Sequence, residues 1–88
     1  MKINGGYVSR VKGDICLIKW QDPETDAGWF ESGIYPELPV VTSVGIFLHE
    51  TDTSIWFAST YHSETQEFAD RMAYPKGCIL HVETLTKV

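Results

Sequence analysis

Hydrophobic and polar residues alternate along most of the chain, in short runs that Gly, Pro and Asp residues separate. A period of two residues is typical of β-strands with one buried face, whereas a helix repeats its apolar positions every three to four residues. The pattern therefore predicts an all-β domain. Its strands are expected over residues 7–12, 15–20, 40–50, 54–61 and 78–85.

The predicted strands differ in how many faces they bury. Residues 15–20 are almost continuously apolar, which is typical of a central strand. Residues 40–50 form the longest strand, and Gly45 in its middle predicts a bulge or a sharp bend, as small barrels need. In the last strand we expect one face to carry Cys78, Leu80 and Val82.

The segments between the strands predict turns, a connector and one short helical region. A polar loop over residues 22–28 leads into a further extended segment, 28–31, so we expect a hairpin across it. Residues 34–39 contain two prolines, which remove backbone donors and indicate a connector or an edge. Residues 62–76 alone have helical features, including a Ser-x-x-Gln capping pattern and an i,i+4 apolar pair, Phe68 and Met72.

These elements predict one domain over residues 1–88. The chain has 88 residues, 43% of them hydrophobic and 12% aromatic, which suits a single small globular unit. Five to six short strands must bury one face, and a partly open barrel does so while limiting exposed edges. We therefore expect such a barrel, with one short helical turn before the last strand.

Charge and hydropathy limit the kinds of partner and the cellular location that we expect. The formal net charge of −5 disfavours nucleic acid as a partner. The basic residues form at most a modest patch, from Arg10, Lys12, Lys19 and Lys76. No apolar run approaches the ~20 residues of a membrane span, and the first residues lack the apolar core of a signal peptide. We expect a cytoplasmic protein without a membrane partner.

The cysteines and histidines predict no metal site and no cofactor. Cys16 and Cys78 each lie in an apolar run, as buried, reduced thiols do. Two cysteines are too few for a disulfide scaffold. His49, His62 and His81 lie far apart, without the spacing of metal ligands. Exposed or hydrogen-bonded histidines are the expected outcome.

Three carboxylates alternate in the loop after residue 21, namely Asp22, Glu24 and Asp26. This spacing resembles the start of a calcium loop, in which several oxygens converge on the ion. Such a loop needs Gly at its sixth position and Glu at its twelfth, where this chain has Ala27 and Gly33. The loop is therefore interpreted as a solvated hairpin connection.

Aromatic residues supply the candidate binding surface. Trp29 and Phe30 are adjacent, so one of the two must point away from the core of a single-layer barrel. Trp56 shares its strand face with small residues, which leaves it free to face a groove. We predict a partner-binding surface built from Trp29, Tyr35 and Trp56, with Asp22, Glu24 and Asp26 as an acidic rim. Packing in the core or against a second copy is the alternative for these aromatic residues.

Two resemblances to known proteins add to this interpretation. Residues 13–22, which end in Trp20-Gln21-Asp22 before a hairpin loop and Gly28-Trp29, resemble the opening of Tudor-like and other Src-homology-3-type small barrels. The layout of residues 14–85 resembles small uncharacterised proteins of bacteriophages and prophages. The resemblance implies a Src-homology-3-type barrel in a bacterial host. Four aromatic cage positions are not assignable, so recognition of methylated ligands is not implied.

The function expected from these features is binding rather than catalysis. An enzyme needs a base or nucleophile beside an orienting group, and His62 with Glu64 or Glu67 is a pair that arises by chance in polar loops. We expect a non-enzymatic module, a phage or prophage accessory protein that binds a bacterial host protein. The alternatives are a structural subunit that self-associates and, less favoured, a small-molecule or nucleotide-binding protein.

Overall fold

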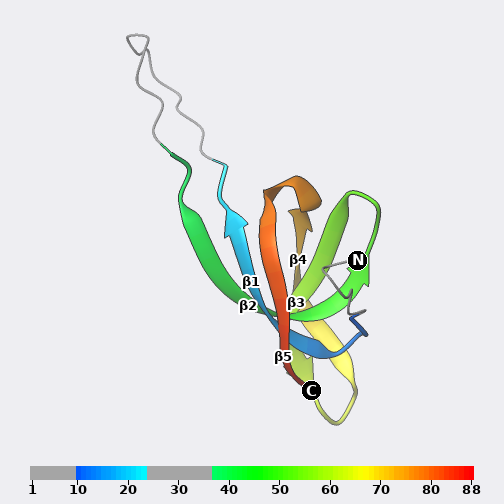
Figure 1. The fold of residues 1–88 in the computed structure, drawn as a ribbon. Helices are drawn as coiled ribbons and strands as arrows, with labels where there is room; N and C mark the ends of the chain where they lie inside the picture. Colours follow the sequence, from blue (N-terminus) through cyan, green and yellow to red (C-terminus); the bar gives the residue numbers. More distant parts are fainter. Residues whose placement is uncertain (1–9, 24–36) are drawn as a thin grey trace.

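Five antiparallel strands form one sheet, in the order β4-β3-β2-β1-β5 (Figure 1). The structure is a computed structural model that describes residues 10–23 and 37–88. Its elements are β1 Asp14–Gln21, β2 Val40–Glu50, β3 Ser54–His62, β4 Glu67–Pro75, a 3-10 turn Lys76–Cys78 and β5 Ile79–Lys87. Both β4 and β5 lie at edges, so the sheet is not closed. The predicted all-β class is confirmed, with one short helical turn before the last strand.

The sheet is curved, so residues of strands that are not neighbours in the sheet meet in the core. Trp20 of β1 and Tyr74 of β4 pack edge to face with ring centroids 5.1 Å apart, although two other strands lie between theirs in the sheet. Figure 1 shows the curvature of β2 that accompanies this contact. The buried core consists of Cys16, Ile18, Phe47, Ile55, Phe57 and Tyr74. Trp20 packs against it, as its strand face predicts.

The side chain of Phe57 on β3 lies close to the backbone of β2 at Gly45. A Cβ atom at this position would lie 2.8 Å from Cβ of Phe57, closer than real Cβ contacts. Glycine is therefore required here because it lets Phe57 pack on the backbone of β2. Of the bulge or sharp bend predicted at Gly45, the bulge lies elsewhere: the register shift in β2 falls between Phe47 and His49, which makes Leu48 the extra residue.

The strand predicted over residues 7–12 is wrong for its described part. Arg10 precedes a turn that contains Lys12 and Gly13. The Asp14 carboxylate accepts a hydrogen bond from the Val11 N–H at 3.0 Å, and Gly13 has a φ of 100°. A side chain that satisfies a turn in this way competes with strand pairing. Residues 7–9 lie outside the described chain.

The predicted hairpin after β1 lies largely outside the described residues, as does the extended segment 28–31. In the described chain β1 pairs with β2, and the Asp22 N–H continues this ladder by donating to the Pro39 carbonyl at 3.1 Å. The second predicted hairpin is confirmed, since β2 and β3 pair in antiparallel register across residues 51–53.

The helical turn expected within residues 62–76 forms only at their end, as the 3-10 turn Lys76–Cys78, because residues 63–66 are a hydrogen-bonded turn and residues 67–75 form β4. The Gln66 N–H donates to the His62 carbonyl at 2.7 Å, and Gln66 has a φ of 60°. Pairing with β3 then supplies the backbone hydrogen bonds of β4, which overrides the local i,i+4 spacing of Phe68 and Met72. In the described residues no helix is long and apolar enough to cross a membrane.

Strand β5 departs from simple alternation. Ile79 and Val82 pack against the core, whereas Leu80 is 55% exposed. The register against β1 shifts between Lys19 and Trp20, and Leu80 is the unpaired extra residue. The prediction that Leu80 shares the face of Val82 is therefore wrong, because a bulge reverses the alternation that precedes it.

Substituting Gly45 by Ala is expected to destabilise the fold by about 1–3 kcal/mol, since the added methyl group overlaps Phe57. Gly77→Ala is the matched control, because nothing lies within 4 Å of a Cβ atom at that position. Its free energy of unfolding should stay the same or rise by at most about 1 kcal/mol. Urea unfolding of both variants measures the difference. Equal stabilities would contradict the role assigned to Gly45.

Candidate functional site

An open groove of about 600 Å³ lies where the end of β2 approaches the start of β4. It is lined by Lys12, Leu48, His49, Gln66, Glu67, Phe68 and Arg71. These residues come from the turn before β1, from β2, from the β3–β4 turn and from β4, and β2 and β4 are not neighbours in the sheet. We call this surface the cationic groove, because Lys12 and Arg71 flank it with one lining carboxylate, Glu67.

Two cation–aromatic contacts build the cationic groove. The Lys12 Nζ atom lies 5.2 Å from the centroid of the Phe68 ring, and the Arg71 guanidinium carbon lies 5.3 Å from the centroid of the Trp56 ring. Such contacts orient the cation by attraction to the ring face. Lys12 thereby links the turn before β1 to the β3–β4 hairpin.

Sheet register places Trp56 next to two residues of the groove lining, His49 and Arg71. Trp56 lies opposite His49 on β2 and opposite Ala73 on β4. The small, buried Ala58 follows two positions later on the same strand face, between Ile46 and Arg71.

The chemistry of the cationic groove suits a ligand that combines negative charge with a flat or apolar surface. An Arg guanidinium that stacks on an aromatic ring keeps its edge N–H groups free to donate to a carboxylate. Leu48 and Phe68 contribute apolar surface beside the two cations. An acidic peptide segment has both features.

The predicted site residues are only partly within the described chain. Trp56 is half-buried in β3, and Asp22 follows the end of β1. Asp22 bonds next to Val40, at the opposite end of β2 from His49, the partner of Trp56. That length of strand spans about 30 Å, so the structure does not bring Trp56 and Asp22 together. The remaining predicted residues lie outside the described chain and their surface stays a prediction: Trp29, Tyr35, Glu24 and Asp26.

Sequence analysis did not identify Phe68 and Arg71 as site residues. They were missed because residues 62–76 were interpreted as helical, and a helix does not place Arg71 beside Trp56 across a pair of strands. The signal for a strand was the spacing of two residues between Phe68, Asp70, Met72 and Tyr74, which in a regular strand places all four on one face. The predicted basic patch is also divided, since Lys12 lines the groove whereas Lys19 does not.

A second charged group, Arg10 with Glu50 and Lys76, has a structural role. The Glu50 carboxylate lies 2.7 Å from the Lys76 Nζ atom and 3.3 Å from an Arg10 guanidinium nitrogen. Burial opposes ionisation of Glu50, but the hydrogen bond and charge of Lys76 together with Arg10 outweigh it and hold the pKa of Glu50 below its usual range. The group joins the segment before β1, the end of β2 and the 3-10 turn.

The cysteines and histidines have local roles. Cys16 and Cys78 are free, and burial raises the pKa of the Cys16 thiol, which keeps it protonated. His62 accepts a hydrogen bond from the Thr65 N–H at 3.2 Å, and His81 lies 3.4 Å from Glu83. All three histidines are exposed, as predicted. Within residues 10–23 and 37–88, no three His, Cys, Asp or Glu side chains are grouped to hold a metal ion.

Comparison with known proteins gives no further constraint. No protein-family model, curated protein or solved structure matches the chain significantly. The resemblance to Src-homology-3-type barrels and to phage proteins therefore stays a prediction, and a function has to be inferred from the site itself.

Glu50→Gln is expected to lower the free energy of unfolding by about 1 kcal/mol at pH 7 through loss of the two ion pairs. The folded-state pKa of Glu50 is lowered, so its stabilisation is fully present above the unfolded-state pKa and is lost as the pH falls through the folded-state pKa. The difference from the wild type should shrink between about pH 5 and about pH 3. Urea titrations at several pH values measure it.

The matched control is Glu64→Gln, because Glu64 is an exposed carboxylate in the β3–β4 turn. Its stability should follow that of the wild type at every pH. If the loss of unfolding free energy in Glu50→Gln were the same at every pH, this would contradict the ion-pair account.

Proposed function

We propose that the protein is a non-enzymatic module that binds another protein, and that the cationic groove receives an acidic segment of this partner. The observation that carries the proposal is the placement of Lys12 over Phe68 and of Arg71 over Trp56 beside the same groove. Trp and Arg are the residue types that contribute most often to the binding energy of protein interfaces.

The charge of the protein favours an acidic protein segment over nucleic acid. Two cations in the groove pair with a few carboxylates, but they neutralise few phosphates along a nucleic-acid strand. Glu67 lines the same groove, and the whole chain carries a formal net charge of −5. Both features repel a continuous polyanion more than a short acidic segment.

The proposed partner differs from the one that an acidic rim implies. A rim of Asp22, Glu24 and Asp26 would attract a basic surface, and the described member of that rim, Asp22, lies away from Trp56. The cationic groove selects the opposite charge. That the partner is a bacterial host protein and the module a phage or prophage factor rests on the resemblance alone and belongs to this proposal.

Affinity capture from a bacterial lysate with charge-reversal variants tests the proposal. Arg71→Glu should release a partner that the wild type retains, because it removes the cation over Trp56 and repels an acidic segment. Lys19→Glu is the matched control, since it makes the same charge reversal at an exposed lysine outside the groove lining. Circular dichroism establishes that both variants remain folded.

The captured partner should have an acidic segment that binds the wild type in isolation, and its affinity should fall with added salt. Loss of the partner with Lys19→Glu as much as with Arg71→Glu would contradict the groove as the binding site. Capture that nuclease treatment abolishes would contradict a protein partner.

A further inference from the structure

The two edges of the sheet differ in how well they can pair with another strand. Within β4, Asp70 has a φ of 59°, and the strand ends at Pro75, which has no backbone N–H. Both features interrupt the row of groups that a new strand would bond. Strand β5 contains neither proline nor glycine, and its register against β1 shifts at Leu80 and at Leu85, so that the residues between these two positions, 81–84, form a regular segment. The edge of β5 is therefore the more competent of the two.

The direction of the backbone groups follows from the register. The hydrogen bond from the Asp22 N–H to the Pro39 carbonyl identifies one bonded pair of the β1–β2 ladder. Bonded and non-bonded pairs alternate along an antiparallel ladder. Counting back along β1 from Asp22, the backbone groups of Lys19 and Leu17 point away from β2 and toward β5.

The partners of Lys19 and Leu17 on β5 are His81 and Glu83. These two residues therefore direct their backbone groups to β1, and Val82 between them directs its N–H and C=O to the free edge. No strand of the described chain pairs with this edge. Val82 is the centre of the unbonded segment.

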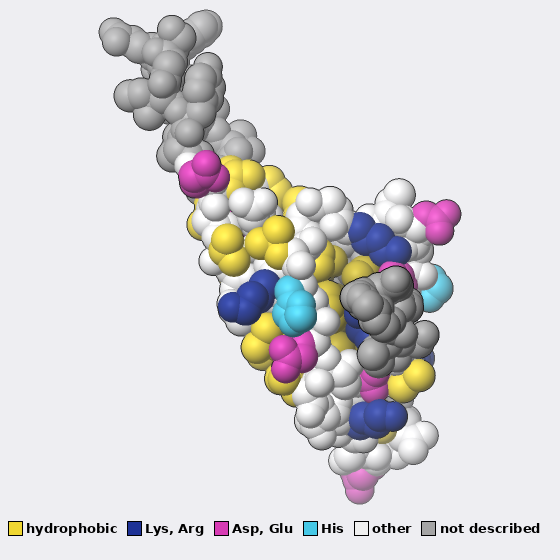
Figure 2. All heavy atoms as spheres, in the orientation of Figure 1, with side chains coloured by type: hydrophobic (Ala, Val, Ile, Leu, Met, Phe, Trp, Pro, Cys, Tyr) yellow, Lys and Arg dark blue, Asp and Glu magenta, His cyan; other side chains and the backbone are white. Residues whose placement is uncertain are grey.

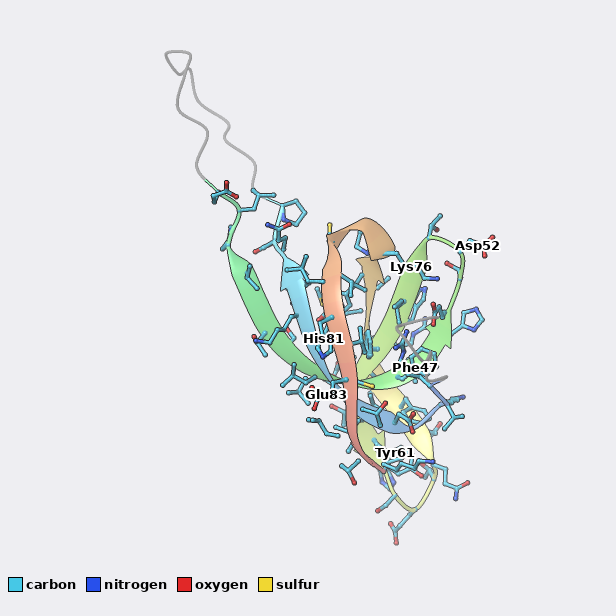
Figure 3. All side chains as sticks on the ribbon, in the orientation of Figure 1. Phe47, Asp52, Tyr61, Lys76, His81 and Glu83 are labelled. Atoms are coloured by element: carbon cyan, nitrogen blue, oxygen red, sulfur yellow. The ribbon has the colours of Figure 1, made fainter. Side chains whose placement is uncertain are left out.

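The residues on either side of Val82 are a histidine and a glutamate, which are a basic and an acidic side chain. His81 and Glu83 lie on the same strand face, 3.4 Å apart and more than half exposed (Figure 3). Figure 2 shows a histidine and an acidic side chain next to each other on the visible face. Two exposed leucines flank this pair, Leu80 at 55% and Leu85 at 50%.

We propose that β5 pairs in antiparallel fashion with β5 of a second copy of this chain, about a twofold axis that passes through Val82. Val82 of each copy then forms a bonded backbone pair with the other. His81 of each copy lies opposite Glu83 of the second copy, where the imidazole N–H donates to the carboxylate.

Charge complementarity selects this register among those that the backbone directions allow. Moving the axis to Glu83 places the Glu83 carboxylates of the two copies directly opposite each other, which is unfavourable. Moving it to Thr84 places His81 opposite Lys87. The axis through Val82 makes two favourable His–Glu pairs and no like-charge pair. The assembly stops at a dimer, because the pairing uses the β5 edge of both copies and the irregular β4 edge does not offer a second pairing site.

Sedimentation velocity over a wide range of protein concentration tests the proposal. The wild type should show a monomer–dimer equilibrium. Glu83→Lys and His81→Glu should each weaken the dimer roughly tenfold, because each removes two complementary pairs, and His81→Glu adds two like-charge pairs. A mixture of these two variants should recover association, since the introduced glutamate of one variant then lies opposite the introduced lysine of the other. Glu64→Lys, away from β5, is the matched control and should dimerise like the wild type.

Recovery in the mixture supports β5 pairing specifically, because it requires the two positions to meet between copies. A wild type that remains monomeric at its highest soluble concentration overturns the proposal. A dimer that neither variant weakens, or a mixture that does not recover, overturns it as well and assigns the interface to another surface. Unfolding midpoints of all variants verify that the exposed substitutions leave the fold intact.

Discussion

The packing of Phe57 on the backbone at Gly45 is the contact on which the shape of the sheet depends. A side chain on β2 at this point would hold β3 away, and the ring would then not reach the core. With glycine there, Phe57 packs edge to face with both Phe47 and Tyr74, at centroid distances of 6.1 Å and 5.6 Å. Tyr74 in turn reaches Trp20 across the curled sheet. A small core of this kind has few contacts to spare, so the aromatic series carries much of its stability.

The curvature also determines where polar chemistry gathers. The aromatic and aliphatic core occupies the inner face, apart from a pocket of about 210 Å³ that Gly45, Phe57 and Tyr74 help to line. Further accessible surface lies at the strand ends, at the outer face and at the edges. The cationic groove lies at one such end, where the bulge at Leu48 interrupts regular pairing between β2 and β3. The edge of β5 is the other accessible feature. The two surfaces use different interactions, cation–aromatic contacts in the first and main-chain pairing in the second, so they can bind separately.

The fold could be predicted from the sequence wherever burial of one face determined the structure. The bounds of β2 agree with the prediction, and β1, β3 and β5 agree within a few residues, because alternation there reflects the core directly. Residues 62–76 were misassigned because a capping pattern and one i,i+4 pair are local signals, whereas β4 depends on its pairing with β3. The strand face of Leu80 was misassigned because a bulge reverses the alternation, and nothing in the sequence indicates where this bulge lies. The cationic groove was beyond prediction since it needs the register that sets Arg71 beside Trp56.

The order of the strands has a kinetic consequence. β2, β3 and β4 are joined by tight turns, so their pairing closes short loops and can form early. β5 pairs with β1 from the far end of the chain, for example Glu83 with Leu17, and the ordering of that long loop must precede any gain from the contact. β5 should therefore join the sheet last, and its amide protons should exchange with solvent through openings that leave the β2–β3–β4 meander intact. The strand with the more available edge is thus also the one whose pairing closes the longest loop between strands of the described chain.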